Sequence, residues 1–148
     1  MRKALISILC VFILAGCSVS SDDGWTNDKD DPIPEDVIDV PDPNVIIDTF
    51  YNNELDGNRQ YLYKWVRTTA LFDEIDRSWL DDLWVYFDVK KPNGYYAKYG
   101  VLCNEMSEKE QDKIHNFDKG KPVVLIGKID GLLAGSRIEF NKCQFPEY

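Results

Sequence analysis

The side chains best suited to covalent chemistry in this sequence are four cysteines, at positions 10, 17, 103 and 143, and one histidine, His115. A nucleophilic enzyme needs a base beside its nucleophile, and a zinc site needs several His or Cys ligands at defined spacings. His115 lies in a charged segment, where a histidine usually faces solvent and does not act as a general base. No Ser-His-Asp set, phosphate-binding loop or zinc-ligand spacing is present in the sequence. The sequence therefore predicts a protein that is not an enzyme, with no catalytic residue, no cofactor and no metal.

Cys17 has a distinctive position near the start of the chain. Residues 1–16 contain a basic start, an apolar run too short to span a bilayer comfortably, and two small residues before the cysteine, which is the layout of an export signal. Leu14-Ala15-Gly16-Cys17 resembles the lipobox of bacterial lipoproteins, in which the cysteine is acylated and becomes the mature N-terminus. The resemblance implies a signal peptide over 1–16, palmitate and related acyl chains on Cys17, and membrane attachment in the bacterial cell envelope. An ordinary secretory signal with a chance cysteine is the alternative.

The charge of the chain limits its partners. The formal net charge is −9, and removal of residues 1–16 takes away two basic and no acidic side chains, which lowers it to −11. A surface of this sign repels phosphate backbones and anionic lipid head groups. General nucleic-acid binding is therefore disfavoured.

Two cysteines remain for the folded part once Cys10 leaves with the signal and Cys17 carries the lipid. An exported compartment is oxidising, which favours a disulfide between Cys103 and Cys143. Closing such a loop stabilises a fold by about 3 to 4 kcal/mol in the chain-entropy model. Two separate buried thiols, or a metal pair that lacks its other ligands, are the alternatives.

The segment 17–44 is predicted to be a disordered acidic tether. It is rich in aspartate and proline, so burial of its few apolar side chains cannot offset the entropy of ordering it. Ser20-Ser21-Asp22-Asp23 resembles the surface-export signal of lipoproteins from Bacteroidetes-type bacteria, which implies an outer-membrane location and leaves surface exposure open. A calcium loop is disfavoured because the Asp-x-Asp-x-Asp-Gly spacing with a distal glutamate is missing.

Residues 45–148 show the patterns of one small domain. A broad apolar stripe after Asn44 predicts a helix over 45–55, ended by Asp56-Gly57-Asn58, and Ser107 with Glu110 predicts a capping box that opens a helix over 106–117. Period-two alternation predicts strands over 61–75, 84–90, 95–103, 123–129 and 136–145. The alternation puts Val66, Thr68, Ala70 and Phe72 on one face of the first strand, and Val123, Leu125, Gly127 and Ile129 on one face of the fourth. Val85, Phe87 and Val89 are expected to face inward, and Ile138, Phe140 and Cys143 to face inward or lie at the rim.

Three strands, a helix and two strands is the order of an OB-fold. We therefore predict a mainly β fold, a five-stranded OB-fold Greek-key barrel, with an N-terminal helix and a helix between strands three and four. The chain resembles the tRNA-anti-like family of OB-fold domains over about residues 45–145. The resemblance rests on Tyr61-x-x-Lys64, the alternation through Phe72 and Ile75, Cys103, Lys119-Gly120, Val123-x-Leu125-x-Gly127 and Asn141-x-Cys143. Ala70 departs from it, because the family commonly has glycine there, so a bulge at this position is less expected.

The outward side chains of strands two and three are the candidates for ligand binding, because OB-folds bind ligands on this face. Stacking on an aromatic ring contributes about 1 to 3 kcal/mol per base or sugar-like ring. The predicted ligand residues on these two strands are Trp84, Tyr86, Tyr95, Tyr96 and Tyr99, and Arg67 on the first strand is added as a nearby basic residue. Packing of these rings within the fold is the alternative for each of them.

The predicted function is a lipid-anchored interaction module of the cell envelope that binds a peptide, a glycan or a protein partner. The tRNA-anti-like resemblance implies kinship with nucleic-acid-binding OB-folds and no established activity for lipoproteins of this kind. Single-stranded nucleic-acid binding and a structural accessory role remain as alternatives.

Overall fold

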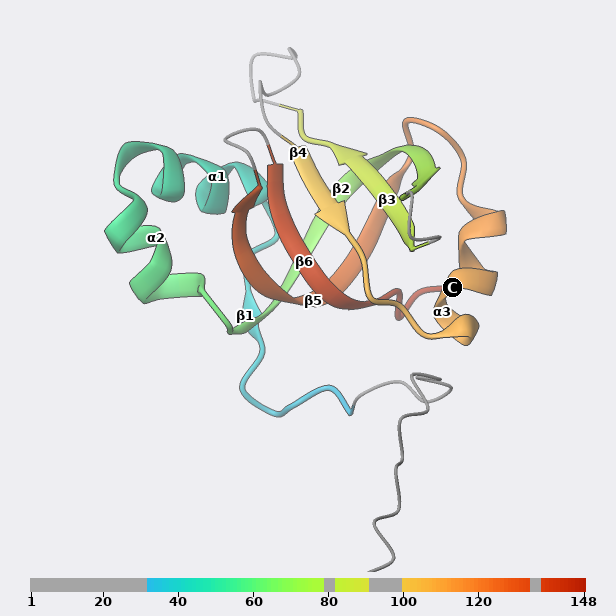
Figure 1. Cartoon of the computed structure of the whole chain (residues 1–148), viewed down its shortest axis with the longest axis horizontal. Coiled ribbons are helices and arrows are strands. Elements are labelled where there is room, and N and C mark those ends of the chain that lie inside the picture. Colours follow the sequence, from blue (N-terminus) through green and yellow to red (C-terminus); the bar gives the residue numbers. More distant parts are fainter. Residues whose placement is uncertain (1–31, 79–81, 91–99, 134–136) are drawn as a thin grey trace, which may run out of the picture.

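Figure 1 shows a computed structural model of the chain, which describes residues 32–78, 82–90, 100–133 and 137–148. Within these residues the fold is mainly β, with a six-stranded sheet and three α-helices. The predicted lipobox with Cys17, and the candidate ligand residues Tyr95, Tyr96 and Tyr99, lie outside the described residues. In the described part of the chain, no helix is long and apolar enough to cross a membrane.

Five of the six strands close on themselves. The strands are β1 (Ile38–Asp39), β2 (Trp65–Arg77), β3 (Leu83–Asp88), β4 (Gly100–Cys103), β5 (Pro122–Leu133) and β6 (Arg137–Gln144). They follow the order β1-β2-β3-β4-β6-β5, and β5 also pairs with β2, so β2 to β6 form a ring. The pairs β1–β2 and β4–β6 are parallel, and the other pairs are antiparallel. The mainly β fold is confirmed, and β1 is a strand beyond the five that were predicted.

The interior of the ring is filled by alternate side chains of each strand. The side chains predicted to face inward over 84–90 and 136–145 are buried, namely Val85, Phe87, Val89, Ile138, Phe140 and Cys143. The residues grouped on one face of β2 and on one face of β5 are buried as well: Val66, Thr68, Ala70, Phe72, Val123, Leu125, Gly127 and Ile129. A fully buried aliphatic or phenyl side chain contributes about 1.5 to 3 kcal/mol to folding. The alternation in the sequence therefore identified the core correctly.

Strand β2 changes partner and phase near its middle. Its first half pairs with β5 and its second half with β3, and the register with β3 shifts between Phe72 and Glu74. Asp73 is the extra residue of this bulge. The next inward-facing side chain after Phe72 is therefore that of Ile75, three residues on. Ile75 and Arg77 continue on this inner side, where β2 and β3 form a hairpin and Ile75 is 43% exposed.

The segment predicted as a tether over 17–44 ends in the sheet. Ile38 pairs with Val66, and the backbone N–H of Val40 donates to the carbonyl oxygen of Arg67 at 2.9 Å. Val40 is also buried against the core. The folded domain therefore begins before residue 45, and the two-residue strand β1 was too short to give a period-two signal.

The N-terminal helix begins earlier than predicted. In α1 (Pro43–Asn52) the N-cap is Asp42, whose carboxylate accepts the backbone N–H of Asn44 at 2.9 Å. Asn44, the predicted cap, instead donates its side-chain amide to the carbonyl oxygen of Lys90 at 3.1 Å. Pro43 in the first helical turn is typical of a helix that starts at this point.

A second helix follows where the sequence predicted the end of the first helix and, at residue 61, the start of a strand. Asn53 caps α2 (Glu54–Tyr61), and Gly57, which was expected to end a helix, lies inside it. A Cβ atom on Gly57 would lie 2.6 Å from ring carbons of Phe50, so glycine permits close packing of α2 against α1. Figure 1 shows the two helices together at one side of the ring.

The helix between β4 and β5 fastens the C-terminal segment. Ser107 caps α3 (Glu108–Lys113) by accepting the Glu110 backbone N–H at 3.3 Å, and the 3₁₀-helix η1 (Ile114–Asn116) follows. The buried Glu110 carboxylate accepts the Phe145 backbone N–H at 2.7 Å and the Lys113 Nζ at 2.7 Å. Lys113 Nζ also donates to the Phe145 carbonyl oxygen at 2.8 Å. We name the three residues Glu110, Lys113 and Phe145 the Glu110 seam.

A disulfide joins β4 to β6, and β5 is longer than predicted. Cys103 at the end of β4 and Cys143 near the end of β6 form a disulfide with a Cα–Cα distance of 5.8 Å, so the predicted bond is confirmed. Strand β5 was expected to end at Asp130-Gly131, but it continues to Leu133 with a register shift between Ile129 and Gly131.

Candidate functional site

Two of the predicted ligand residues lie side by side on the outer face of β3. The rings of Trp84 and Tyr86 are half-buried, with their centroids 6.4 Å apart and their planes at 72°. Their neighbours in β3, Val85 and Phe87, point into the ring of strands and are fully buried. This alternation holds the two rings at the surface as a pair.

Arg67, the third described candidate, does not join them. It lies in the first half of β2, where its partners are Asp39 in β1 and Ile126 in β5. The β2 residue opposite Trp84 is Asp76, which lies nine residues further on, or about 30 Å along an extended strand. The prediction that Arg67 shares a site with the aromatic pair is therefore not supported by the fold, because alternation gives the face of a residue but not its place along a long strand.

A carboxylate lies opposite each ring of the pair. In the β2–β3 register, Glu74 faces Tyr86 and Asp76 faces Trp84, and both carboxylates are exposed. Residues directly opposite on one face of an antiparallel pair have Cβ atoms about 5 Å apart. We name these four residues, Trp84, Tyr86, Glu74 and Asp76, the aromatic–acidic face.

Arg137 at the start of β6 adds a cation to this face. Its guanidinium carbon lies 4.6 Å from the centroid of the Tyr86 ring, within the range of a cation–π contact. Its Nη1 is buried and has no hydrogen-bond partner in the described structure. Gly100 makes room for this arrangement, because a Cβ atom there would lie 2.3 Å from the Phe87 carbonyl oxygen and 3.6 Å from the Arg137 Nη1.

Burial, together with nearby carboxylates, raises the pKa of two side chains at this surface. Burial raises the pKa of the Tyr86 phenol, the carboxylates of Asp76 and Glu74 raise it further, and Arg137 opposes them. Burial also raises the pKa of Asp88, with Asp73 and Glu74 adding to the rise and Arg137 and Lys119 opposing it. In both groups the raised pKa favours the protonated form, which carries no negative charge. Burial and the carboxylates therefore outweigh the nearby cations.

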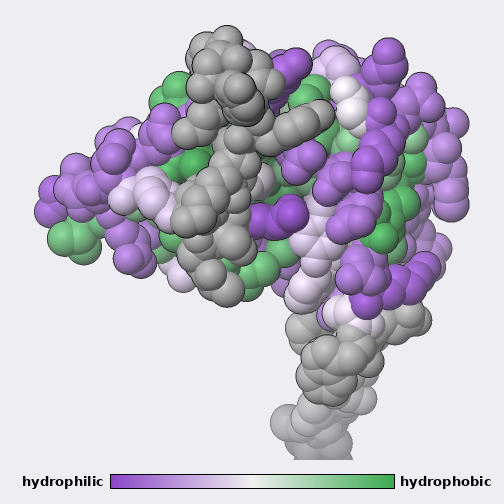
Figure 2. Space-filling view, turned by 90° about the horizontal axis from the view of Figure 1, so that it is seen from above, coloured by the Kyte–Doolittle hydropathy of each residue, from purple (hydrophilic) through white to green (hydrophobic). Residues whose placement is uncertain are grey.

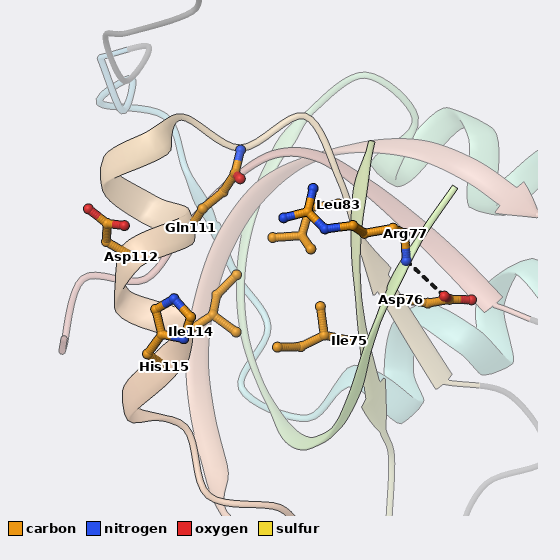
Figure 3. A pocket seen from close by; sticks show the side chains of 8 residues that line it. All are labelled: Ile75, Asp76, Arg77, Leu83, Gln111, Asp112, Ile114 and His115. Atoms are coloured by element: carbon orange, nitrogen blue, oxygen red, sulfur yellow. Dashed lines mark hydrogen bonds between the residues drawn. The ribbon is translucent and has the colours of Figure 1, made fainter. Parts of the chain in front are cut away.

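The inner side of the same hairpin lines a pocket of about 560 Å³. Figure 3 shows the hairpin on one side and α3 with η1 on the other, with Ile75 and Ile114 directed into the space between them and Asp112 directed away. The lining residues are Ile75, Asp76, Arg77, Leu83, Gln111, Asp112, Ile114 and His115. The volume falls in the range of small-molecule sites, but the lining is mostly polar and carries charges of both signs.

The pocket and Arg137 were not found by reasoning from the sequence. The pocket depends on the bulge at Asp73, which turns Ile75 toward α3. The spacing of three residues between the apolar Phe72 and Ile75, in place of two, was the sign of this bulge in the sequence. Arg137 reaches Tyr86 through the parallel β4–β6 pairing, which no local pattern encodes. In the part of the chain that the structure describes, no cluster of three His, Cys, Asp or Glu side chains could hold a metal ion.

Figure 2 shows a mostly hydrophilic surface from above, in which hydrophobic areas are separated by polar ones. The exposed large apolar side chains of the described residues are Ile33, Val45, Tyr51, Leu55, Tyr63, Ile75 and Tyr148. Of these, Ile75 alone lies in the β2–β3 hairpin. The aromatic–acidic face therefore differs from an apolar docking patch: its rings are set among charges.

Comparison with known proteins gives a fold but no family. No family model matches the chain, and no curated protein matches it, so the resemblance to the tRNA-anti-like family stays a prediction. A crystal structure from Klebsiella pneumoniae subsp. pneumoniae MGH 78578, described as a "putative nucleic acid-binding lipoprotein", is similar, with a TM-score of 0.58. The two chains are 12% identical, and the match covers 76% of this chain and 98% of the other. At this identity the similarity concerns the fold alone.

Proposed function

We propose that this protein is a lipid-anchored binding module of the bacterial cell envelope, with an OB-fold of the tRNA-anti-like type. The strand order supports the fold, because β2-β3-β4-β6-β5 closing on β2 is the order of a five-stranded OB barrel, with β1 added beside β2. The sequence Leu14-Ala15-Gly16-Cys17 supports an acyl anchor on Cys17. The outer membrane is the proposed location.

The ligand of this module contacts the aromatic–acidic face. The observation that carries this proposal is the Trp84–Tyr86 pair, which lies on the strand face where OB-folds bind their ligands. Each ring is fixed by its half-buried position and keeps surface on which a planar or cationic group can stack. The chain binds a peptide, a glycan or a protein partner there without catalysing a reaction.

Single-stranded nucleic acid is the second candidate ligand. It is favoured by the description of the Klebsiella pneumoniae structure and by the ability of aromatic pairs to stack on bases. It is opposed by Glu74 and Asp76, which lie opposite both rings and repel phosphates. The net charge of −9 acts in the same direction.

The test is a binding panel on the full-length protein, purified from bacterial membranes in a neutral detergent. Peptides, chito-oligosaccharides and single-stranded DNA are titrated at two salt concentrations and followed by fluorescence anisotropy. We expect a peptide or glycan to bind and to lose about tenfold in affinity on Trp84→Ala or Tyr86→Ala, since one stacked ring contributes about 1 to 3 kcal/mol. Tyr51→Ala is the matched control, because Tyr51 is an exposed aromatic residue on α1.

Three results would change the conclusion. A ligand that binds all variants equally well would move the site away from β3. Salt-sensitive DNA binding that is lost on Tyr86→Ala would favour the second candidate, and silence toward every ligand would favour the structural accessory role. For the anchor, Cys17→Ser should abolish palmitate labelling and release the protein from the membrane fraction.

A further inference from the structure

We propose that the ligand of the aromatic–acidic face is a basic segment of another protein, whose lysine or arginine side chains stack on Trp84 and Tyr86 beside Glu74 and Asp76. This inference rests on the proposed function and names the chemistry of its partner. The argument uses the register of the hairpin, the contact of Arg137 and the sum of the charges on the face.

The register gives each of the two rings a carboxylate as its neighbour across the hairpin. Trp84 lies opposite Asp76, and Tyr86 lies opposite Glu74, so each ring has one carboxylate as its cross-strand neighbour. An ammonium or guanidinium group binds an aromatic face and a carboxylate at the same time, because both present negative electrostatic potential. Trp84 and Tyr86 are two residues apart on one strand, which is about 7 Å, the spacing of alternate side chains in an extended peptide.

Arg137 demonstrates the contact within the chain itself. Its guanidinium carbon lies 4.6 Å from the Tyr86 centroid, so this ring already binds one cation from the β6 side. No corresponding cation contact occurs at Trp84 among the described residues, whose cation–π pairs are Lys128 with Tyr63 and Arg137 with Tyr86. Trp84 is therefore the ring that a cation from a partner would occupy, and tryptophan is the strongest of the aromatic rings in such contacts.

The charges on the face favour a cationic partner over an anionic one. The carboxylates on the outer side of the hairpin and β6 are Glu74, Asp76, Asp88 and Glu139. The cations of β6 are Arg137 at its start and Lys142 toward its end. Nearby, Lys119 is paired with Asp73 at 2.9 Å, so its charge is largely matched. A neutral sugar would gain the stacking but not the charge, and a phosphate chain would be repelled.

The experiment uses the full-length protein in neutral detergent and a fluorescein-labelled peptide of six Lys-Gly repeats. The comparison probes are a Glu-Gly peptide of the same length, a chito-oligosaccharide and dT12. We expect the Lys-Gly peptide alone to bind, with affinity that falls as salt rises. Trp84→Ala should weaken it about tenfold, and Glu74→Gln with Asp76→Asn about fivefold.

A charge-matched control separates the face from the overall charge of the protein. Glu35→Gln with Asp48→Asn removes two exposed carboxylates that are distant from Glu74 and Asp76 in the sequence. This pair should lower the affinity for the Lys-Gly peptide less than twofold. Trp84→Phe keeps an aromatic ring and guards against a folding defect in Trp84→Ala, and it should retain most of the affinity. Circular dichroism checks that each variant is folded.

The remaining outcomes overturn the inference in distinguishable ways. If the control pair weakens the Lys-Gly peptide as much as the Glu74 and Asp76 pair does, the attraction belongs to the whole surface and the inference fails. If dT12 or the sugar binds through Trp84 and the Lys-Gly peptide does not, the inference fails while the proposed function stands. If no probe depends on Trp84, both fail.

Discussion

The Glu110 seam and the aromatic–acidic face contain the same kinds of groups, carboxylates with a cation and aromatic neighbours, but use them in opposite ways. In the seam, the Glu110 side chain is 2% exposed and both of its oxygens have short partners, while the Phe145 ring packs against Phe117 at 4.9 Å. On the face, Glu74 and Asp76 are exposed, and Arg137 keeps a buried nitrogen without a partner. The difference teaches that charges satisfied inside the chain hold the fold, whereas charges left at the surface are available to a partner.

The largest effect on stability is expected beside the seam, at the disulfide between Cys103 and Cys143. The bond joins residues 40 positions apart, and a loop of this size contributes about 4 kcal/mol in the chain-entropy model. Cys103→Ala with Cys143→Ala should lower the free energy of unfolding by about this amount in urea titrations. A loss below about 1 kcal/mol would mean that the bond constrains little.

The next effect is expected within the seam. Glu110→Ala should destabilise the protein by about 3 kcal/mol, because it leaves the Phe145 N–H and the Lys113 ammonium without their buried acceptor. Glu108→Ala, at an exposed position of the same helix, is the control and should change the free energy of unfolding by less than about 1 kcal/mol. Equal effects of the two variants would contradict the comparison.

Removal of the carboxylates on the face should have the opposite sign. Glu74→Gln with Asp76→Asn relieves repulsion between like charges, and neither carboxylate forms an ion pair among the described residues, so stability should stay the same or rise by about 0.5 kcal/mol. Thermal unfolding in low and high salt measures this, and the gain should shrink as salt screens the charges. A clear loss of stability would assign these carboxylates to the fold.

The smallest expected effect is a pH dependence at Asp88. Because burial and then Asp73 raise its pKa in the folded state, the folded protein binds this proton more tightly than the unfolded chain, and stability falls as pH rises from the ordinary Asp pKa to the raised one. Asp88→Asn, which cannot titrate, should be more stable than the parent above this window by a few tenths of a kcal/mol and equal to it below. An advantage that grows toward low pH would contradict the sign.

The sequence predicted features that depend on local periodicity and on compartment chemistry. Alternation identified the buried side of β2, such as Val66 and Phe72, and the oxidising compartment predicted the Cys103–Cys143 bond. Ser107 was recognised as a cap from its type and from Glu110 three residues later.

Features that depend on contacts between distant segments were not predicted. The helix start was assigned to Asn44 from its residue type, but the N-cap is Asp42, and the Asn44 side chain donates to the carbonyl oxygen of the distant residue Lys90. Arg67 was grouped with Trp84 since no local signal gives its place along a 13-residue strand. The Arg137–Tyr86 contact depends on which strands become neighbours, and tertiary packing decides that.

The parallel pairing of β1 with β2 gives the domain a direction of mechanical strength. With the anchor at Cys17 and the partner that we propose, force from the membrane would enter through the N-terminal end of β1, and force from the partner would act on the C-terminal half of β2. Because the two strands are parallel, these loads pull them in opposite directions along their shared axis. The hydrogen bonds from Val40 to Arg67 and from Thr69 to Pro41 are then loaded together in shear and are not broken one after another.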